Sequence, residues 1–451
     1  TNYNLCDTIA FMIIKNVKIN NFRSVEKQSI DLAPLTFLYG NNAVGKSSLF
    51  YALNILRNIV TDPGQPVDKF FDLGFANLGT FKQVVFKHED TKSITIAVSG
   101  KHGNTDFTYG VKINPKQSEF FVEIEKPYSL KLRLPVTFPY TLNGNLQEAF
   151  IFQEITYSIN WTGVVAQVTP TTVNEETNKQ AKTIAYLLNR GVQLVRNVDL
   201  VPLRRGFSKP QYGVVNITQF PITEEEVASL LAVDDYLDSK LSTYLEQTID
   251  RQFRAKPQSG TSLTSLTTIE KVSKISSDIV NDGFGVNQLV YLLAKTLNKN
   301  AITVCIEEPE INLHPSVVRK VPHTLIELVK DEGKQLIVST HSESLILALL
   351  SAIAREEITT NDVICYLTTR ANGVTDFTKQ EITEDGQISE GLISFMGGEL
   401  EDIETFFKAK KKNKGKKENK KDLSDAKATE TIATNPPESK SDNQEPNSEK
   451  Q

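Results

Sequence analysis

The chain has 451 residues and a formal net charge of −5, and 39% of its residues are hydrophobic. These values suit a soluble globular protein of two to three domains, at about 150 residues each. The small negative charge excludes a protein that coats nucleic acid with a wholly basic surface, although a local basic patch is compatible with it.

The number of cysteines and the length of the apolar runs indicate in which compartment the protein is expected. The three cysteines, Cys6, Cys305 and Cys365, are odd in number and far apart in sequence. We therefore expect no disulfide framework, and we expect the protein to be cytoplasmic. The apolar run 345–350 is far shorter than the roughly 20 residues that span a bilayer, so no membrane association is expected. Residues 1–11 lack the basic start of a signal peptide. We expect them to be an extension, either disordered or outside the natural reading frame.

The first part of the chain predicts the opening of an α/β domain. Strands are expected over 13–20 and 35–39, followed by a glycine-bounded loop and a helix from about 45 to 60. Period-two alternation over 80–165 then predicts an antiparallel β-rich lobe.

The middle of the chain has weaker patterns. One helix is expected near 176–190. A second is expected from Thr223, which forms a capping box with Glu226, to about Gln247. Residues 254–268 are polar and are expected to be a loop.

Strand–helix alternation returns after residue 270. Helices are expected over 287–299, 315–331 and 342–354, and strands over 301–306, 335–340 and 362–367. Alternation at both ends of the chain predicts one parallel-sheet domain, interrupted by the β lobe and a helical segment.

The composition changes at residue 408. Residues 408–421 hold nine Lys and one Glu, and 422–451 are rich in Asp, Glu, Ser, Asn, Thr and Pro. Too few apolar groups remain to offset the entropy of ordering, so a disordered tail is expected. The lysine run is either a solvated charged segment or a weak, salt-sensitive contact to nucleic acid.

The strongest chemical signal follows the strand at 35–39. The pattern G-x-x-x-x-G-K-[ST] is matched by Gly40, Asn41, Asn42, Ala43, Val44, Gly45, Lys46 and Ser47. Successive N–H groups of such a loop point at phosphate oxygens, and the helix N-terminus adds partial positive charge. We expect Lys46 to reach the β- and γ-phosphates and the Ser47 hydroxyl to ligate Mg²⁺, so the expected cofactors are ATP and Mg²⁺.

A second signal is the acidic pair that ends the strand at 301–306. Glu307 and Glu308 stand where a Walker B strand presents carboxylates beside the phosphate loop. Glu307 is expected to hold Mg²⁺ through water, and Glu308 to polarise the attacking water. The common pattern has Asp at the first position, so the longer arm of Glu307 leaves the metal geometry open.

Two further motifs flank that strand in sequence. Gly283 and Gly285 open a helix, where backbone N–H groups can approach a phosphate. His341 follows the strand at 335–340, where an imidazole can contact the γ-phosphate. The alternative is that the neighbouring Ser and Thr cap the next helix and the histidine is incidental.

These elements, in this order, resemble one superfamily. The chain is similar to ABC-type ATPases of the SMC/RecF/OLD branch, and most like stand-alone bacterial OLD-like AAA-type ATPases that lack a Toprim domain. The stretches that carry the resemblance are INNFRS (19–24), LYGNN (38–42), GKSSL (45–49), GFGVNQ (283–288), EEPEINLHP (307–315) and STHS (339–342). They lie within about 13–400, and no motif is matched over 120–270.

The resemblance implies an α/β fold: a P-loop NTPase head of ABC type with a parallel-rich sheet, an inserted antiparallel β lobe and a helical segment. It also implies that two heads pair head to tail, as a homodimer or a higher even oligomer. The phosphate loop of one head, together with Ser48, then binds ATP. The other head covers that ATP with its Gly283, Gly285 and Gln288. This segment departs from the Ser-Gly-Gly-Gln signature of transporters.

The expected function is an ATP-hydrolysing switch in DNA maintenance or antiviral defence, with Glu308, His341 and Lys46 as catalytic residues. Its expected partners are DNA or a separate effector protein. The alternative is an ATP-dependent assembly scaffold or regulator of an effector, without DNA affinity. A basic groove on the folded part distinguishes the two. A third possibility, the nucleotide-binding subunit of a transporter, does not fit the β-rich insert and the Glu-Glu-Pro-Glu string.

The expected domain boundaries follow from these segments. They are 12–80 (first part of the ATPase head), 81–165 (β-rich lobe), 166–270 (mixed or helical arm), 271–405 (second part of the head) and 406–451 (tail).

Overall fold

The computed structural model describes residues 13–258, 260–388, 405 and 408. The predictions for residues 1–11 and for the tail therefore fall outside the described residues, except at position 408. The chain divides into two units, Thr1–Gly391 and Leu392–Gln451, and the first holds every element below. Within the described residues, the structure has no helix with the length and apolar character needed to cross a membrane.

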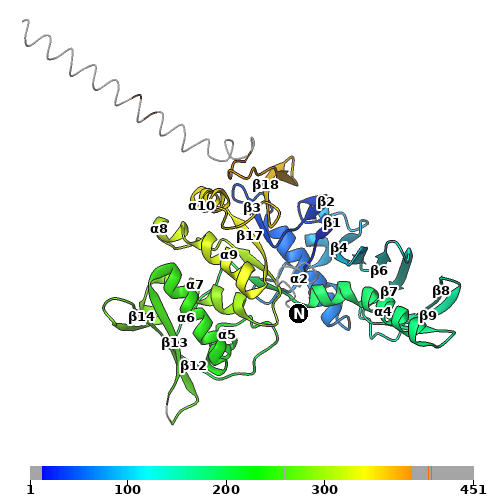
Figure 1. The fold of residues 1–451 in the computed structure, drawn as a ribbon, viewed down its shortest axis with the longest axis horizontal. Helices are drawn as coiled ribbons and strands as arrows, with labels where there is room; N and C mark the ends of the chain where they lie inside the picture. The colour runs from blue at the N-terminus through cyan, green and yellow to red at the C-terminus, as the bar shows by residue number, and fades with distance from the viewer. Residues whose placement is uncertain (1–12, 259, 389–404, 406–407, 409–451) are drawn as a thin grey trace, which may run out of the picture. The chain divides into compact units, whose positions relative to one another are not determined.

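One six-stranded sheet is built from both ends of the chain. Its strands, in spatial order, are β11 (Val198–Val201), β16 (Thr303–Glu307), β17 (Gln335–Thr340), β3 (Leu35–Tyr39), β18 (Val363–Ala371) and β19 (Val374–Gln380). All neighbours are parallel except β18 and β19. The strands β3 and β17 lie side by side although they are far apart in sequence (Figure 1). β3, β16 and β17 are buried throughout, as parallel strands covered on both faces are.

Helices precede or follow these strands, and the motifs lie at the turns between them. The helices are α2 (Ser47–Thr61), α7 (Phe284–Leu297), α8 (Pro315–Val318), α9 (Val321–Glu332) and α10 (Glu343–Ala354). The helix expected over 315–331 is two helices, since α8 ends before α9 begins at Val321. Because the carboxyl ends of parallel strands meet at one edge, the loops after β3, β16 and β17 converge there.

A second six-stranded sheet is antiparallel and confirms the expected β-rich character. Its order is β2 (Val25–Asp31), β1 (Asn16–Phe22), β4 (Ile94–His102), β5 (Thr105–Ile113), β6 (Ser118–Ile124) and β7 (Leu130–Val136). The first expected strand thus belongs to this sheet. Strand β7 alternates strictly between buried and exposed side chains, because one face of the sheet is covered.

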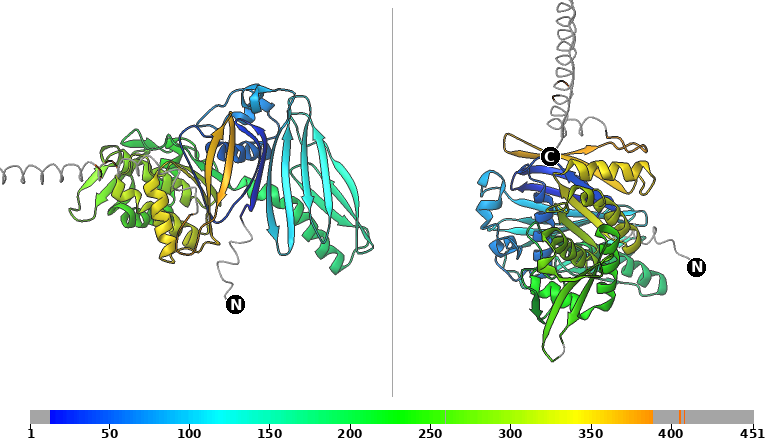
Figure 2. Two further views of the ribbon diagram at one scale, coloured as in Figure 1. Left: turned by 90° about the horizontal axis from the view of Figure 1, so that it is seen from above. Right: turned by 90° about the vertical axis from the view of Figure 1, so that its left-hand side faces the viewer.

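The covered face of that sheet lies against α4 (Glu175–Arg196), which contacts β4, β5 and β6 (Figure 2). One hydrophobic cluster runs from the sheet through α2 and α4. A Cβ on Gly191 would lie 2.1 Å from the Cβ of Tyr109, so glycine is required for this close approach. A three-stranded sheet of β8 (Leu146–Phe152), β9 (Ile155–Trp161) and β10 (Ala166–Pro170) continues the β-rich part.

The prediction of a loop over 254–268 is wrong. The structure has a hairpin there, formed by β13 (Arg251–Pro257) and β14 (Leu263–Glu270). Along β14 the side chains of Thr264, Leu266 and Thr268 are buried in alternation. Threonine is polar but β-branched, so a Thr-rich stretch forms a strand once one face is covered. β12 (Gln211–Gly213) and β15 (Ser276–Asp278) complete this sheet.

The capping box at Thr223 is confirmed. The Thr223 hydroxyl accepts the Glu226 N–H at 3.2 Å, and the Glu226 carboxylate accepts the Thr223 N–H at 3.2 Å. The single expected helix is two, α5 (Glu224–Val233) and α6 (Asp235–Ile249), because Asp234 caps a new helix start. The remaining short helices are η1 (Val67–Phe71), α3 (Phe81–Val84), η2 (Phe86–His88) and η3 (Ile279–Asn281).

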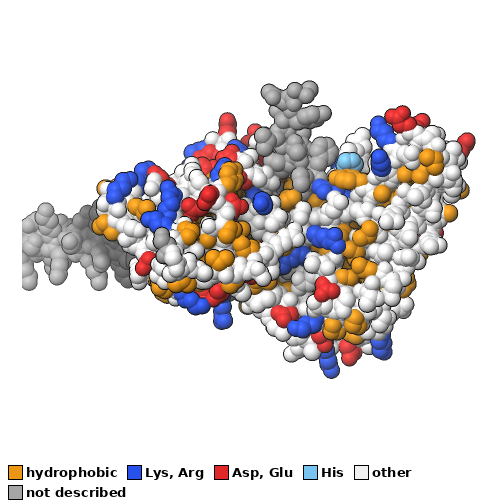
Figure 3. All heavy atoms as spheres, turned by 90° about the horizontal axis from the view of Figure 1, so that it is seen from below, with side chains coloured by type: hydrophobic (Ala, Val, Ile, Leu, Met, Phe, Trp, Pro, Cys, Tyr) orange, Lys and Arg blue, Asp and Glu red, His pale blue; other side chains and the backbone are white. Residues whose placement is uncertain are grey.

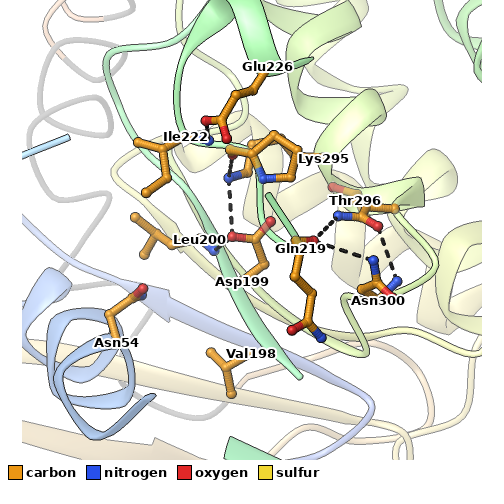
Figure 4. A network of polar contacts seen from close by, with 12 residues as sticks. Asn54, Val198, Asp199, Leu200, Gln219, Ile222, Glu226, Lys295, Thr296 and Asn300 are labelled. Carbon is orange, nitrogen blue, oxygen red and sulfur yellow. Dashed lines mark hydrogen bonds and ion pairs between the residues drawn. The ribbon is translucent and has the colours of Figure 1, made fainter. Parts of the chain in front are cut away.

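A buried ion cluster joins the parallel sheet to two helices. Asp199 of β11 lies 3.1 Å from the ammonium of Lys295 on α7 and 3.6 Å from the guanidinium of Arg57 on α2. Figure 4 shows Lys295 and Asp199 facing each other, with Lys295 also donating to the Pro221 carbonyl at 2.6 Å. Burial lowers the pKa of Lys295, and the charge of Asp199 opposes that effect. The cluster fixes α7 and α2 against β11.

Asp199→Asn is therefore expected to lower the free energy of unfolding by about 3–5 kcal/mol, because two buried cations lose their anion. Chemical denaturation measures the change. The control is Arg133→Gln, which breaks surface pairs with Glu119 and Glu123 and is expected to cost less than about 1 kcal/mol. Equal effects of the two substitutions would contradict the stabilising role of the buried cluster.

Candidate nucleotide-binding site

A cavity of about 250 Å³ lies at the edge where β3, β16 and β17 end. The phosphate-loop residues 42–47 line one side of it, and Glu307, Glu308 and Ser339 line another. The other lining residues are Arg23, Ser24, Leu203 and Arg370. The structure thus brings together the two motifs that the sequence places roughly 260 residues apart.

The phosphate loop is held in a tight left-handed path. Gly40 has a φ of 146°, and a Cβ there would lie 2.3 Å from the Thr368 carbonyl oxygen of β18. Only glycine tolerates both conditions. Thr375 of β19 donates to the Val44 carbonyl at 2.6 Å, and Arg370 donates to the Ala43 carbonyl at 3.3 Å. The β18–β19 hairpin therefore anchors the loop.

Lys46 lies folded across its own loop. Its ammonium donates to the carbonyl oxygens of Gly40 and Asn41 at 2.7 and 2.8 Å. Burial lowers its pKa, while the charges of Glu308 and Glu310 oppose that effect. A partly desolvated cation of this kind interacts strongly with phosphate oxygens.

The acidic pair occupies the sharp turn after β16. Glu307 is buried and its carboxylate accepts the Leu203 N–H at 3.1 Å. Glu308 has a φ of 42°, a left-handed backbone that costs a non-glycine residue about 1–3 kcal/mol. Its carboxylate lies 3.2 Å from Nδ1 of His341, a half-exposed side chain. Two of the predicted catalytic residues are therefore in contact.

Glu310 is a site residue that the sequence names within the resemblance and as an alternative position of the catalytic base. It accepts the Thr340 hydroxyl at 2.5 Å and the His341 N–H at 3.3 Å. Its second oxygen, Oε2, is buried and has no hydrogen-bond partner among the residues that the structure describes. Burial raises the pKa of this carboxyl.

Because the folded state raises this pKa, the folded chain keeps the Glu310 proton to a higher pH than the unfolded chain. Ionisation therefore costs stability at neutral pH, and the cost disappears as pH falls below about 4.5. Glu310→Gln is expected to raise the free energy of unfolding at pH 7 relative to the native chain, with the difference shrinking towards acid. Urea unfolding at several pH values tests this, and a difference that is independent of pH would contradict it.

The donor set at the cavity fits a Mg²⁺ ion. Ser47 and Glu307 both line it, and hydroxyl and carboxylate oxygens are the ligands that this ion prefers. The Glu307 carboxylate accepts the Leu203 N–H and is also hydrogen-bonded to the Tyr51 side chain, so both contacts orient it at the cavity. Burial, reinforced by the charge of Glu307, raises the pKa of Tyr51 to about 12, so this phenol stays neutral beside the carboxylate.

The glycines at the start of α7 lie outside this cavity. None of Gly283, Gly285 and Gln288 lines it. Gln288 instead accepts a hydrogen bond from Asn312 at 3.3 Å, and the Phe284 side chain is 78% exposed. Within one chain, the phosphate loop and this segment are therefore not brought together.

Two arginines complete the cavity wall. Arg23, in the turn between β1 and β2, stacks over the Tyr51 ring at 5.0 Å, and burial lowers its pKa. In the sequence, Arg23 was marked only by the INNFRS stretch (19–24), which is part of the resemblance. Arg370 had no such signal, because it reaches the loop only through the pairing of β18 with β3.

A protein-family model described as "AAA ATPase domain" matches residues 12–209 and 171–346, which together span more than half of the chain. The chain belongs to this family of ATPase domains. The family confirms the predicted resemblance, and with it the ATPase class. The parallel-rich sheet with helices and the separate antiparallel sheet confirm the α/β fold class.

Curated relatives of this ATPase domain are distant in sequence. The Old nuclease of Escherichia phage P2 is 24% identical over 76% of this chain, and Endonuclease GajA of Bacillus cereus is 22% identical over 78%. This chain spans only 58% and 60% of their respective lengths. An ATP/GTP phosphatase of Helicobacter pylori is 22% identical over 76% of this chain and 89% of its own length.

Solved structures similar to the ATPase domain include SMC head domains. The head from Thermotoga maritima has a TM-score of 0.41 at 11% identity, covering 82% of this chain and 100% of that one. The head from Pyrococcus furiosus with the C-terminal domain of ScpA has a TM-score of 0.41 at 11% identity, covering 81% and 96%.

Proposed function

We propose that this chain binds ATP with Mg²⁺ and hydrolyses it to ADP and phosphate in the cavity at the edge of the parallel sheet. The observation that carries the proposal is that the phosphate loop and the acidic pair Glu307 and Glu308 line one cavity. A relative named ATP/GTP phosphatase, aligned over 89% of its length, supports the same reaction class.

Each side chain has a role in this proposal. The Lys46 ammonium leaves the loop carbonyls and binds the β- and γ-phosphates, while loop N–H groups bind the remaining phosphate oxygens. Ser47 and Glu307 hold Mg²⁺, which neutralises phosphate charge when bound. Glu308 accepts a hydrogen bond from the attacking water and orients it, and His341 holds Glu308 and faces the γ-phosphate.

The proposed active form is a pair of chains, as a homodimer or a higher even oligomer. Its support is that Gly283, Gly285 and Gln288 do not reach the cavity of their own chain. In a head-to-tail pair these residues close over the ATP of the partner. Hydrolysis then releases the pair, which makes ATP a switch.

The proposed setting of the switch is DNA maintenance or antiviral defence, in a reducing cytoplasm. Two relatives are named nucleases, which supports a link to nucleic acid, and Cys305 and Cys365 are free thiols. On the face that Figure 3 shows, Lys and Arg side chains of the described residues stand among Asp and Glu. The second candidate, a scaffold that regulates a separate effector protein without binding DNA, needs no basic groove, and the mixture of charges on this one face is compatible with it.

The ATPase rate of the purified chain, measured over a range of protein concentrations with and without duplex DNA, tests the proposal. We expect the rate per chain to rise with concentration, because each site needs a partner, and to level off when all chains are paired. A further rise with DNA supports the DNA-linked switch, and no response supports the scaffold. If the rate per chain stays constant on dilution to concentrations at which the chains are single, each site works without a partner, and the proposed shared site is contradicted.

A further inference from the structure

The residues that follow β11 run directly beside the acidic pair. β11 is the parallel neighbour of β16, with Val201 opposite Ile306. Because both strands end at the same edge, residues 202–207 leave the sheet next to Glu307 and Glu308. We call residues 202–207 the β11 extension.

One end of the β11 extension is bonded to the acidic turn at three points, and a fourth bond, from Arg205 to Pro202, lies within the extension itself. The Arg205 guanidinium donates to the Glu307 carbonyl at 2.6 Å, to the Glu308 carbonyl at 2.7 Å and to the Pro202 carbonyl at 3.0 Å. The Leu203 N–H donates to the Glu307 carboxylate at 3.1 Å. Arg205 thus binds both backbone carbonyls of a turn whose second residue, Glu308, is left-handed.

A planar, forked donor suits this task. The guanidinium presents several N–H groups in fixed directions, so it can fix two carbonyls relative to each other. A lysine ammonium is a point charge on a flexible stem and cannot reproduce that geometry. Burial lowers the pKa of Arg205 to about 10, opposed by the charges of Glu310, Glu307 and Glu308, so it is a cation at neutral pH.

The other end of the β11 extension is bonded to the first turn of α7. Asn287 accepts the Phe207 N–H at 2.6 Å and donates to the Phe207 carbonyl at 2.8 Å. Asn287 is buried, and it immediately precedes Gln288 of the segment that faces a partner chain in the proposed function. Between the two ends, Gly206 has a φ of 122°, and a Cβ there would lie 2.7 Å from Asn287 Oδ1.

We propose that the β11 extension couples the first turn of α7 to the acidic turn, and that Arg205 is the positioning residue that holds Glu308 in line with the attacking water. This rests on the proposed ATP hydrolysis. When a partner's nucleotide moves the start of α7, Asn287 shifts Phe207 and Arg205 shifts the Glu308 backbone. Glu308 is then aligned only in the paired state.

The first test separates positioning from binding. Arg205→Gln and Arg205→Lys are expected to lower kcat at least about 10-fold, since a misplacement near 1 Å costs up to about 100-fold. The Kd of a fluorescent ATP analogue is expected to change less than about 3-fold, because Arg205 does not line the cavity. The control is Arg133→Gln, at an exposed arginine of β7 outside the cavity and the β11 extension, with kcat unchanged. Equal kcat in all variants, or full rescue by lysine, overturns the proposal.

The second test does not depend on hydrolysis. Asn287→Ala removes both bonds to Phe207, and hydrogen–deuterium exchange follows the backbone amides of 307–311 in the full chain without nucleotide. Faster exchange there than in the native chain, with β1–β7 unchanged, supports the coupling, and unchanged exchange overturns it. If the native chain hydrolyses no ATP, the proposed function fails, and this exchange result alone decides whether the coupling exists.

Discussion

Glu308→Gln is expected to lower kcat for ATP hydrolysis at least about 100-fold while ATP still binds. Glutamine keeps the size of the side chain, but its amide cannot act as the carboxylate that orients and deprotonates water. The contact at 3.2 Å to His341 becomes a neutral one. Because ATP remains unhydrolysed, the chains are expected to accumulate as the closed pair.

Two measurements check this expectation together. Steady-state phosphate release gives kcat, and size-exclusion chromatography with light scattering gives the mass in the presence of ATP and Mg²⁺. The control is Glu148→Gln on β8, an exposed glutamate outside the cavity. Turnover retained in Glu308→Gln would place the base elsewhere, at Glu310 or His341, both of which lie beside it.

Lys46→Ala is expected to weaken ATP binding at least about 100-fold, equivalent to the loss of about 3 kcal/mol. The ammonium is a buried cation that donates to two neutral carbonyls. Exchanging them for phosphate oxygens gives charge-assisted hydrogen bonds, which are about twice as strong. Without the ammonium, ATP brings negative charge next to Glu307 and Glu308 with one less cation to balance it.

Titration with a fluorescent ATP analogue measures the change in Kd, and thermal melting of the free chain shows that the variant is folded. The control is Lys82→Ala on α3, whose exposed side chain lies outside the cavity. An unchanged Kd in a folded Lys46→Ala chain would move the nucleotide to another part of the protein.

The phosphate loop was predictable because its signals are local. A buried strand, a glycine-bounded turn and a helix follow one another without a gap, and each pattern needs only its neighbours in sequence. The strand expected over 35–39 has those bounds as β3. The strand expected over 335–340 is likewise β17. The acidic pair was predictable because Glu307 ends such a strand.

The sequence by itself therefore determined four strands of the six-stranded sheet (β3, β16, β17 and β18), the phosphate loop and the acidic pair. Only the tertiary structure decided which other residues join them. Arg370 lies on β18 and Leu203 follows β11, and the composition of these two strands carries no functional pattern. The Thr-rich hairpin at 254–268 forms because another part of the chain covers one of its faces. Strand pairing and burial depend on residues hundreds of positions away, so local periodicity cannot encode them.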